Sequence, residues 1–529
     1  MLLNFKRLVF FFWLAIIFCG SYVSAQVSFG ENIRVDHDTT SYYGPDNPSV
    51  ISGRDNTLYT MWADCRTGNY NFHIYFSKST DGGETWGKDV LVCSGIDYSL
   101  NPDFVIDSSN ILYAVWSADV SANASYVYFS KSTDSGTTWA TPVRIDDGGS
   151  ENYAAKPKIA IDKAGTLYVV WYDKRDGNYN IYFTKSTNGG DYWRPNIRVN
   201  STTANRQCRS VISIWEDILY VMWDGDQTGN WDVYFSSSID GGTNWSNEVR
   251  VNDITVNEQW LPSLTVGKEG TIYGVWYDYR KEGDTCDIYF SKSTNSGLSW
   301  ESSRKVTDQC FCIAPPSADK VCIAVDTLGN IHCTWGDYRG GSCDIYFSYS
   351  IDDGLTWAPN VMVNDNTFAA QRYPDMCMDR DNNLCLVWSD ARNGNDFDLY
   401  CCKGTLSTGI ENIKTYDNLA VFLYQNYPNP FSTTTAIKLS GYQAIKSNNP
   451  IARLLDSSVA LEIYDLSGRL IRTFRVNPCS NLCQSVSWDG YDDDGKMVPN
   501  GIYLYMVRAD TWGCPYTNFT LSKKMTILK

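Results

Sequence analysis

The sequence predicts an all-β protein: a seven-bladed β-propeller closed by an N-terminal strand, followed by a small C-terminal β-sandwich. Two repeats lead to this prediction. The octapeptide STDGGETW (79–86) returns five more times, at intervals of 52 to 57 residues. A longer unit around it occurs seven times, marked by Trp62, Trp116, Trp171, Trp223, Trp276, Trp335 and Trp388. A repeat of about 50 residues that holds several strands is typical of propellers.

Each unit divides into four strands by alternation and turn signals. The first strand, such as PSVIS (48–52), follows a proline in five of the seven units. A turn leads to the second strand, which ends at the marker Trp, and a further turn leads to a third strand such as IYFS. The octapeptide follows, and then a short fourth strand such as VRID (143–146). Four antiparallel strands repeated radially make a propeller.

The two ends of the array predict how the ring closes. The seventh unit stops after DLYCCKG and lacks a fourth strand, whereas NIRVDHD (32–38) resembles a fourth strand with no blade before it. We therefore expect residues 32–36 to pair with the third strand of the last blade. This pairing hides an open sheet edge and gives a propeller over residues 26–405.

The octapeptide has a structural interpretation at every position. Its Gly permits positive φ in a tight turn, its Asp or Asn accepts backbone hydrogen bonds, and its Trp anchors the turn on its own or the next blade. We assign this structural role, and no catalytic one, to Asp81, Trp86, Asp134, Trp139, Asn188, Trp193, Asp240, Trp245, Asn295, Trp300, Asp352 and Trp357.

The pattern S/T-x-D-x-G-x-x-W resembles the Asp box, or BNR repeat, of sialidase (neuraminidase) propellers. The resemblance covers about residues 30–405 and implies a propeller with glycan-related chemistry. The sequence departs from that family, whose propellers have six blades and an early Arg-Ile-Pro motif. Catalysis there also needs three arginines, a Tyr–Glu pair and an Asp, whereas the conspicuous charged residues here are repeated.

The repeated charges form the motif Asp-x-Arg just after the marker Trp in five of the seven units. These turns lie on the same face as the loops between blades, where sialidase-like sites lie. They could ring a pocket mouth, or each Asp could cap its turn while its Arg pairs across blades. Repetition favours the second interpretation for Asp64–Arg66, Asp173–Arg175, Asp278–Arg280, Asp337–Arg339 and Asp390–Arg392.

The loops between blades differ from one another, and function more often lies in such loops. Aromatic platforms with polar groups suit sugars or peptides, although the same aromatics could plug the funnel between blades. No catalytic residue is assigned, and Glu151 and Glu258 are the only loop glutamates considered as catalytic carboxylates. The ligand-binding candidates are Tyr42, Tyr153, Arg206, Arg209, Glu258, Trp260, Arg372 and Tyr373.

The chain ends predict export. Residues 1–25 have the charged start, apolar core and small-residue end of a signal peptide. After a linker (406–419), residues 420–529 carry YPNPF, IYDLSGR, WDGYDDDGK, GIY and KM in order. This order resembles the type IX secretion sorting domain and the immunoglobulin-like domain of hook-capping proteins. It implies the type IX machinery as a partner and a place on the cell surface or outside the cell.

Composition narrows the function. A net charge of −16 argues against nucleic acid, and no later apolar stretch is long enough to span a membrane. We expect no metal or cofactor. The stretch DGYDDDGK (489–496) reads as a turn in preference to a calcium site. Of 17 cysteines, Cys19 leaves with the signal peptide and the other sixteen permit disulfides.

We predict a glycan- or protein-binding module; the alternatives are a sialidase-type glycoside hydrolase and a structural or adhesive surface protein.

Overall fold

The computed structural model describes residues 26–38, 44–66, 71–203, 205–281, 286–308, 320–394 and 396–407, and in the C-terminal part 421–423, 426, 431–441, 459–465, 469–475, 484–509 and 519–527. The chain divides into two compact units, Met1–Thr408 and Gly409–Lys529. The predicted signal peptide, Tyr42 and most of the predicted linker lie outside the described residues. In the part of the chain described, no helix is long and apolar enough to cross a membrane.

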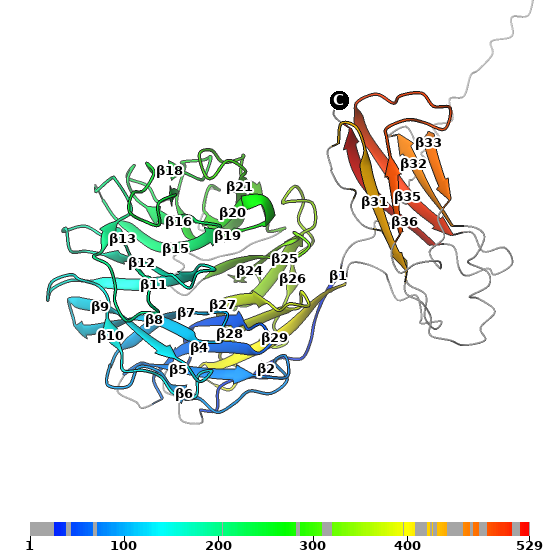
Figure 1. Cartoon of the computed structure of the whole chain (residues 1–529). Helices are drawn as coiled ribbons and strands as arrows, with labels where there is room; N and C mark the ends of the chain where they lie inside the picture. The colour runs from blue at the N-terminus through cyan, green and yellow to red at the C-terminus, as the bar shows by residue number, and fades with distance from the viewer. Residues whose placement is uncertain are drawn as a thin grey trace, which may run out of the picture. The chain divides into compact units, whose positions relative to one another are not determined.

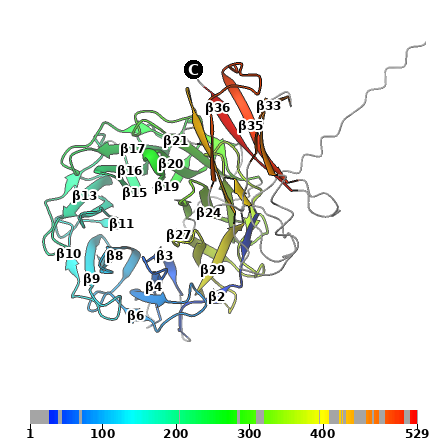
Figure 2. The same cartoon turned by 45° about the vertical axis from the view of Figure 1, so that its right-hand side comes forward.

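Seven antiparallel sheets follow one another around a ring in the first unit (Figures 1 and 2), which confirms the seven-bladed propeller. Six blades have four strands in chain order. The first three blades are β3 (Asp46–Ser52), β4 (Leu58–Asp64), β5 (His73–Ser79) and β6 (Val90–Leu91); β7 (Ser99–Ile106), β8 (Leu112–Ser121), β9 (Ala124–Ser132) and β10 (Val143–Arg144); and β11 (Ala154–Ile161), β12 (Leu167–Asp173), β13 (Asn180–Ser186) and β14 (Ile197–Arg198).

The next three blades repeat this pattern. They are β15 (Gln207–Trp215), β16 (Ile218–Gly225), β17 (Asp232–Ser238) and β18 (Val249–Arg250); β19 (Gln259–Val266), β20 (Ile272–Asp278), β21 (Asp287–Ser293) and β22 (Arg304–Lys305); and β23 (Val321–Val325), β24 (Ile331–Asp337), β25 (Asp344–Ser350) and β26 (Val361–Met362). The second strand of each blade is almost wholly buried and its marker Trp is 0% exposed, so the cores lie between successive sheets.

The seventh blade joins the two ends of the ring, as predicted. It holds β27 (Gln371–Met378), β28 (Leu384–Asp390) and β29 (Asp398–Ser407), and β2 (Ile33–Arg34) supplies its fourth strand. Ile33 pairs with Cys401 and Arg34 with Tyr400. One feature was not predicted: β1 (Gln26–Phe29) also pairs with β29. It finds room there because β29 has ten residues, whereas most other third strands have seven.

The octapeptides close their turns with side-chain hydrogen bonds. In blade 1, Ser79 Oγ accepts from Gly83 N (2.8 Å) and donates to Asp81 Oδ1 (2.7 Å). Thr85 donates to the same carboxylate through its N (3.0 Å) and its Oγ1 (2.5 Å). Thr85 and Ser79 thereby lower the pKa of Asp81 to about 2. Each octapeptide Asp or Asn accepts hydrogen bonds within its own turn.

The octapeptide Trp packs against the preceding blade and not the next one, and Trp300 of blade 5 also lies against Gly274 of its own blade, as expected. Trp245 of blade 4, for example, meets the edge of Phe183 of blade 3 at 5.3 Å. The same Phe sits over the octapeptide glycine: a Cβ on Gly242 would lie 2.2 Å from Phe183 Cε1. Each turn thus locks onto the third strand of the previous blade, so the repeated contact joins blades as well as closing a turn.

The second unit consists of two sheets, as predicted for a small β-sandwich. One sheet orders β30 (Val421–Leu423), β31 (Thr435–Gly441) and β34 (Gln484–Trp488), and the other β33 (Leu470–Arg475), β32 (Val459–Asp465), β35 (Gly501–Ala509) and β36 (Phe519–Ile527). Trp488, Ile463 and Tyr505 are 0% exposed in its core. In DGYDDDGK, Asp492 Oδ1 accepts from Asp494 N and Lys496 N, so this stretch is a turn.

Candidate functional site

A cavity of about 310 Å³ lies among the first strands of the seven blades. Every blade contributes to its lining, which is made of residues 101–103, 156–159, 209–212, 261–264 and 320–323 with Asn47, Tyr373 and Asp375. Because each first strand faces the axis of the ring, corresponding residues of different blades meet here. The lining does not repeat from blade to blade, so we take this central cavity as the candidate site.

A β-bulge in the first strands shapes one layer of the cavity lining, which we call the upper layer. The register of β11 shifts between Ala155 and Lys158, and Lys156 has a φ of 50°. Such bulges re-aim a side chain at one point of a strand. The corresponding residues of five other blades have left-handed φ too and also line the cavity: Asn47, Asn101, Arg209, Leu261 and Tyr373.

A second layer of the cavity lining, which we call the middle layer, holds two ion pairs whose opposite charges balance. Lys158 Nζ lies 3.0 Å from Asp103 Oδ1, and Lys320 Nζ lies 2.8 Å from Asp375 Oδ1. Each carboxylate also accepts a backbone N–H from a neighbouring blade, at 2.9 Å. Burial raises the pKa of Asp375, but Lys320 and Lys158 outweigh it and hold that pKa below its usual value. These four charges hold one another in place.

The upper layer and its surroundings contain two cations that form no such direct ion pair within the described residues. Among the described residues, Lys156 Nζ has no hydrogen-bond or ion-pair partner, and burial together with nearby Arg209 lowers its pKa. Arg372 likewise has no ion pair within the described ranges, and its guanidinium lies 5.3 Å from the Phe397 ring centre. By contrast, Arg209 Nε donates to Asp224 Oδ2 at 2.7 Å.

Asp46 lies in the field of these cations. Burial raises its pKa to about 6, against the opposing effects of Lys156 and Arg372. Its Oδ1 accepts from Asn47 Nδ2 at 3.1 Å. This region therefore combines two cations that lack an ion-paired carboxylate among the described residues with a carboxyl group whose pKa burial raises to about 6.

Aromatic rings continue from the cavity over blades 3 to 5. Trp231 and Trp260 are stacked at 5.0 Å, and the Arg209 guanidinium lies 4.4 Å from the Trp260 ring. Tyr153 meets Tyr179 edge-on at 6.1 Å. We call Tyr153, Tyr179, Trp231 and Trp260 the aromatic strip. Arg209 lines the cavity and its guanidinium contacts Trp260 of the strip, so the strip adjoins the cavity.

The structure separates the predicted residues into three groups. Arg209 and Tyr373 line the cavity, and Arg372 lies near Asp46. Tyr153 and Trp260 belong to the strip, and Arg206 sits over Trp231 at 4.8 Å while pairing with Asp226 at 3.0 Å. Glu258 and Glu151 are exposed. Trp260 lies outside the cavity lining, so Trp260 and Tyr373 do not fill the cavity together.

The sequence analysis missed the charged residues of the first strands themselves. Asp46, Asp103, Lys156, Lys158, Lys320 and Asp375 carry most of the charge in and beside the cavity. One signal was available: aligned first strands read NPS, NPD, KPK, RSV, LPS and YPD at the bulge. These positions vary in charge between units whose flanking strands are nearly identical.

The repeated Asp-x-Arg motif serves the fold. Asp64 Oδ2 accepts from Trp62 Nε1 at 3.2 Å and from Arg66 Nη2 at 2.6 Å, and the Arg66 guanidinium covers the Tyr75 ring at 3.8 Å. The other four motifs show the same arrangement. Four of the five arginines also reach a carboxylate of the preceding blade. The motif caps turns and joins blades, as its repetition indicated.

Comparison with known proteins gives the fold class. Residues 456–513 match the FlgD Ig-like domain family, and no curated protein matches the sequence. An ulvan lyase of polysaccharide lyase family PL25, solved with -[GlcA(1-4)Rha3S]-, is 12% identical with a TM-score of 0.51, covering 70% of this chain and 95% of its own. At this identity the likeness shows the propeller fold alone.

Two further solved structures are similar. A protein of unknown function from Dyadobacter fermentans is 13% identical with a TM-score of 0.46, over 72% of this chain and 99% of its own. The NanB sialidase of Streptococcus pneumoniae is 11% identical with a TM-score of 0.41, over 71% and 70%. The observed sheets and the family match together make the chain a β-propeller followed by an Ig-like domain.

Proposed function

We propose that the propeller binds an anionic glycan in the central cavity and along the aromatic strip. The observation that carries this proposal is Lys156, which lines a cavity whose lining does not repeat, with Arg372 nearby. Among the described residues neither cation has an ion-paired carboxylate, although Asp46 lies in the field of both. Burying a cation without a partner is costly. A carboxylate or sulfate group of a ligand would remove this cost, and Arg372 could bind either group through two parallel hydrogen bonds.

The aromatic strip supports a sugar as the rest of the ligand. Concave sites for such ligands combine aromatic walls with a few fixed polar groups. Here Trp260 is partly exposed, and the exposed Arg206 flanks the strip. The strip extends to one side of the cavity, over blades 3 to 5. This placement suits a chain of several sugar units that enters the cavity at one end.

Export completes the proposal. The signal peptide (1–25) and the ordered motifs of residues 420–529 support passage to the cell surface or beyond it through type IX secretion. A chain that ends at residue 419 should then stay in the periplasm with its propeller folded. Normal surface display of this truncated chain, followed by protease shaving of intact cells, would contradict the sorting role.

Calorimetric titration of the mature chain tests the glycan proposal. The ligands are oligogalacturonides, heparin-derived oligosaccharides and neutral cello-oligosaccharides. We expect binding of at least one anionic series, and Lys156→Asn should weaken it by about tenfold or more because a charge-assisted contact is lost. Equal affinity for the neutral series, or no effect of Lys156→Asn on anionic binding, would overturn the proposal.

The repeat itself supplies a variant that keeps the fold. Asn47 and Asn101 occupy the same bulge position as Lys156, with φ of 47° and 54°, and each precedes a proline as Lys156 does. Asn tolerates this conformation better than most residues. Lys88→Asn is the matched control, because it removes the same charge from an exposed position outside the cavity lining.

A second candidate is an enzyme that cleaves the bound glycan, and Asp46 is the observation that favours it. A carboxyl group whose pKa lies near the working pH suits general acid–base catalysis. Asp46→Asn should then abolish release of reducing ends from a bound polysaccharide while leaving affinity within a few fold. Product release that persists in Asp46→Asn would exclude Asp46 from this role.

A further inference from the structure

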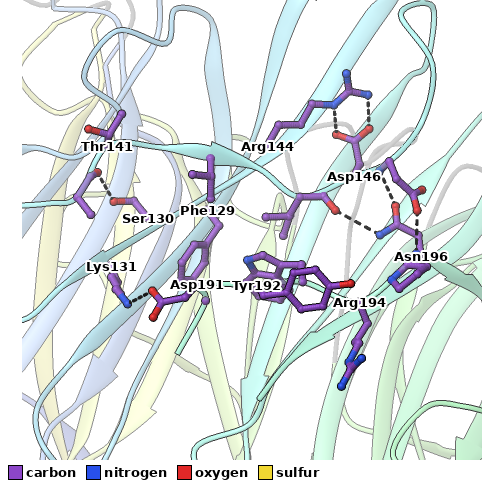
Figure 3. Close-up of a pocket in the computed structure, with 17 residues that line it drawn as sticks. Phe129, Ser130, Lys131, Thr141, Arg144, Asp146, Asp191, Tyr192, Arg194 and Asn196 are labelled. Atoms are coloured by element: carbon purple, nitrogen blue, oxygen red, sulfur yellow. Dashed lines mark hydrogen bonds and ion pairs between the residues drawn. The ribbon is translucent and has the colours of Figure 1, made fainter. Parts of the chain in front are cut away.

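A groove of about 640 Å³ lies between blades 2 and 3. Figure 3 shows residues that line it. It is lined by residues between 129 and 147, which include β10, and by residues 190–196, which include the end of the third octapeptide. We call it the inter-blade groove. None of its lining residues lines the central cavity.

Tyr192 in this groove breaks the octapeptide pattern. At its position the other five octapeptides carry Thr85, Thr138, Asn244, Ser299 and Thr356, and each of these bonds the octapeptide Asp or Asn at 2.5–2.8 Å through its side chain. Tyr192 makes only the backbone contact, with its N donating to Asn188 Oδ1 at 3.0 Å. The residue is 57% exposed, and its hydroxyl has no partner among the described residues.

Arg194 breaks the pattern as well. The corresponding residues of the other octapeptide blades are Gly87, Ala140, Ser246, Glu301 and Ala358. Arg194 is exposed, and its guanidinium lies 5.7 Å from the Tyr192 ring. In the described part of the chain it has no ion-pair partner. Blade 3 therefore has an aromatic ring and a cation side by side where other blades have a self-contained turn.

The remaining charges of the groove are compensated. Lys131 Nζ lies 2.6 Å from Asp191 Oδ1, and Arg144 Nη2 lies 2.6 Å from Asp146 Oδ1; Figure 3 shows these pairs on either side of Tyr192. Asp147 pairs with Arg175. Arg194 is thus the surplus charge of the groove, on a protein whose net charge is −16.

We propose that the inter-blade groove is a second saccharide site, which takes one pyranose unit bearing a carboxylate or sulfate. The sugar ring would lie on the exposed face of Tyr192, since a pyranose presents an apolar face of C–H groups. The anionic group would pair with Arg194, and the Lys131–Asp191 pair would bond the ring hydroxyls. A polysaccharide held here stays attached while another part of it reaches the central cavity, which raises its effective concentration there.

Affinity electrophoresis of the mature chain tests this site. Native gels contain dextran, dextran sulfate or polygalacturonate, and the chain carries Lys156→Asn so that the central cavity contributes little. We expect both anionic polymers, or one of them, to retard the protein, while dextran does not. Retardation by dextran sulfate alone indicates a sulfate ligand, and retardation by polygalacturonate alone a carboxylate. Ion exchange is a poor explanation for retardation, because the acidic protein repels both polymers.

Three variants locate the binding in the groove. In blade 5, Asn295 donates a hydrogen bond to Ser299 at the corresponding position. Tyr192→Ser should let Asn188 make the same hydrogen bond in blade 3, so the fold should be kept. Tyr192→Ser and Arg194→Ala should each weaken retardation by about tenfold, whereas Tyr192→Phe keeps the ring and most of the affinity. Unfolding curves verify that the variants are folded.

The outcomes separate this site from the central cavity. Undiminished retardation of Tyr192→Ser, or equal retardation by dextran, would overturn the groove proposal. If the groove variants weaken polymer binding while Lys156→Asn alone has no effect on small anionic oligosaccharides, the groove proposal stands and the cavity proposal falls.

Discussion

Two glycines of blade 4 measure how much the octapeptide contributes by joining blades. Gly242 in the octapeptide and Gly229 in the turn before β17 both have a φ of 86°. A Cβ on Gly242 would lie 2.2 Å from Phe183 Cε1, whereas a Cβ on Gly229 would meet nothing within 4 Å. Phe183 is 1% exposed and cannot swing away into solvent.

The structure sets the expected magnitudes. Alanine at either position adopts a left-handed φ, which costs about 1–2 kcal/mol. Only Gly242→Ala adds overlap with a buried ring, and overpacking of this kind costs a further ~1–3 kcal/mol. We therefore expect the free energy of unfolding to fall about 1–3 kcal/mol further in Gly242→Ala than in Gly229→Ala.

Equilibrium urea unfolding, followed by Trp fluorescence, measures both losses. An unchanged slope of the free energy against urea concentration would show that the surface exposed on unfolding is unchanged. A double variant tests the cause. In a Phe183→Leu background the ring is gone, so the penalty of Gly242→Ala should shrink to that of Gly229→Ala. Equal losses for the two single variants would show that the turn does not lock the blades together.

Three other results are expected. Deleting residues 26–38 exposes the edge of β29 and removes Val35, which is 0% exposed, so the propeller should melt markedly lower; an unchanged melting temperature would refute closure. The pKa of Asp81, Asp134 and Asp240 is about 2, below the usual 3.8, so their stabilisation is present above pH ~4 and fades as pH falls toward 2. Blades 3 and 5 carry Asn at this position. Replacing the three Asp residues by Asn should make the urea midpoint depend less on pH over this range. A midpoint that falls as much with pH as in the unmodified protein would refute the role given to these carboxylates. A fluorogenic sialoside should not be turned over, since Arg206 and Arg209 already pair with Asp226 and Asp224; robust turnover abolished by Arg372→Ala would reverse this conclusion.

Periodicity made the ring predictable, because units of near-identical sequence must adopt the same strands. Closure could be predicted too, since a fourth strand was missing at one end and surplus at the other. The extra strand β1 was not predicted, because nothing in QVSF marks it as a partner of β29. The sequence could not predict which of the sixteen cysteines form disulfides. In the structure the following cysteines are free thiols: Cys93, Cys208, Cys322, Cys333, Cys377, Cys385, Cys401 and Cys402.

The cavity was harder to predict than the ring. Asp46, Lys156 and Arg372 lie in blades 1, 3 and 7, and only the closed ring brings them together. Lys156 also reaches the cavity through a bulge with a left-handed φ, a conformation that a lysine before proline does not announce. Arg209 and Tyr373 were predicted because the loops between blades differ in sequence. In the structure both residues lie at the bulge of the first strands, in the upper layer, and not in the loops themselves.

The pairing of Ile33 with Cys401 also orders events in time. The first segment of the propeller to leave the ribosome therefore waits for a partner that is made last in the propeller. Each blade can fold once a neighbouring blade is present, since its strands are local and its core lies against the next sheet. The ring, however, stays open until residue 401 has emerged. Contacts between such distant residues form slowly. An open arc of blades has unpaired ends that a closed ring lacks, so the propeller reaches its most stable state only after residue 401 of the 529-residue chain has been synthesised.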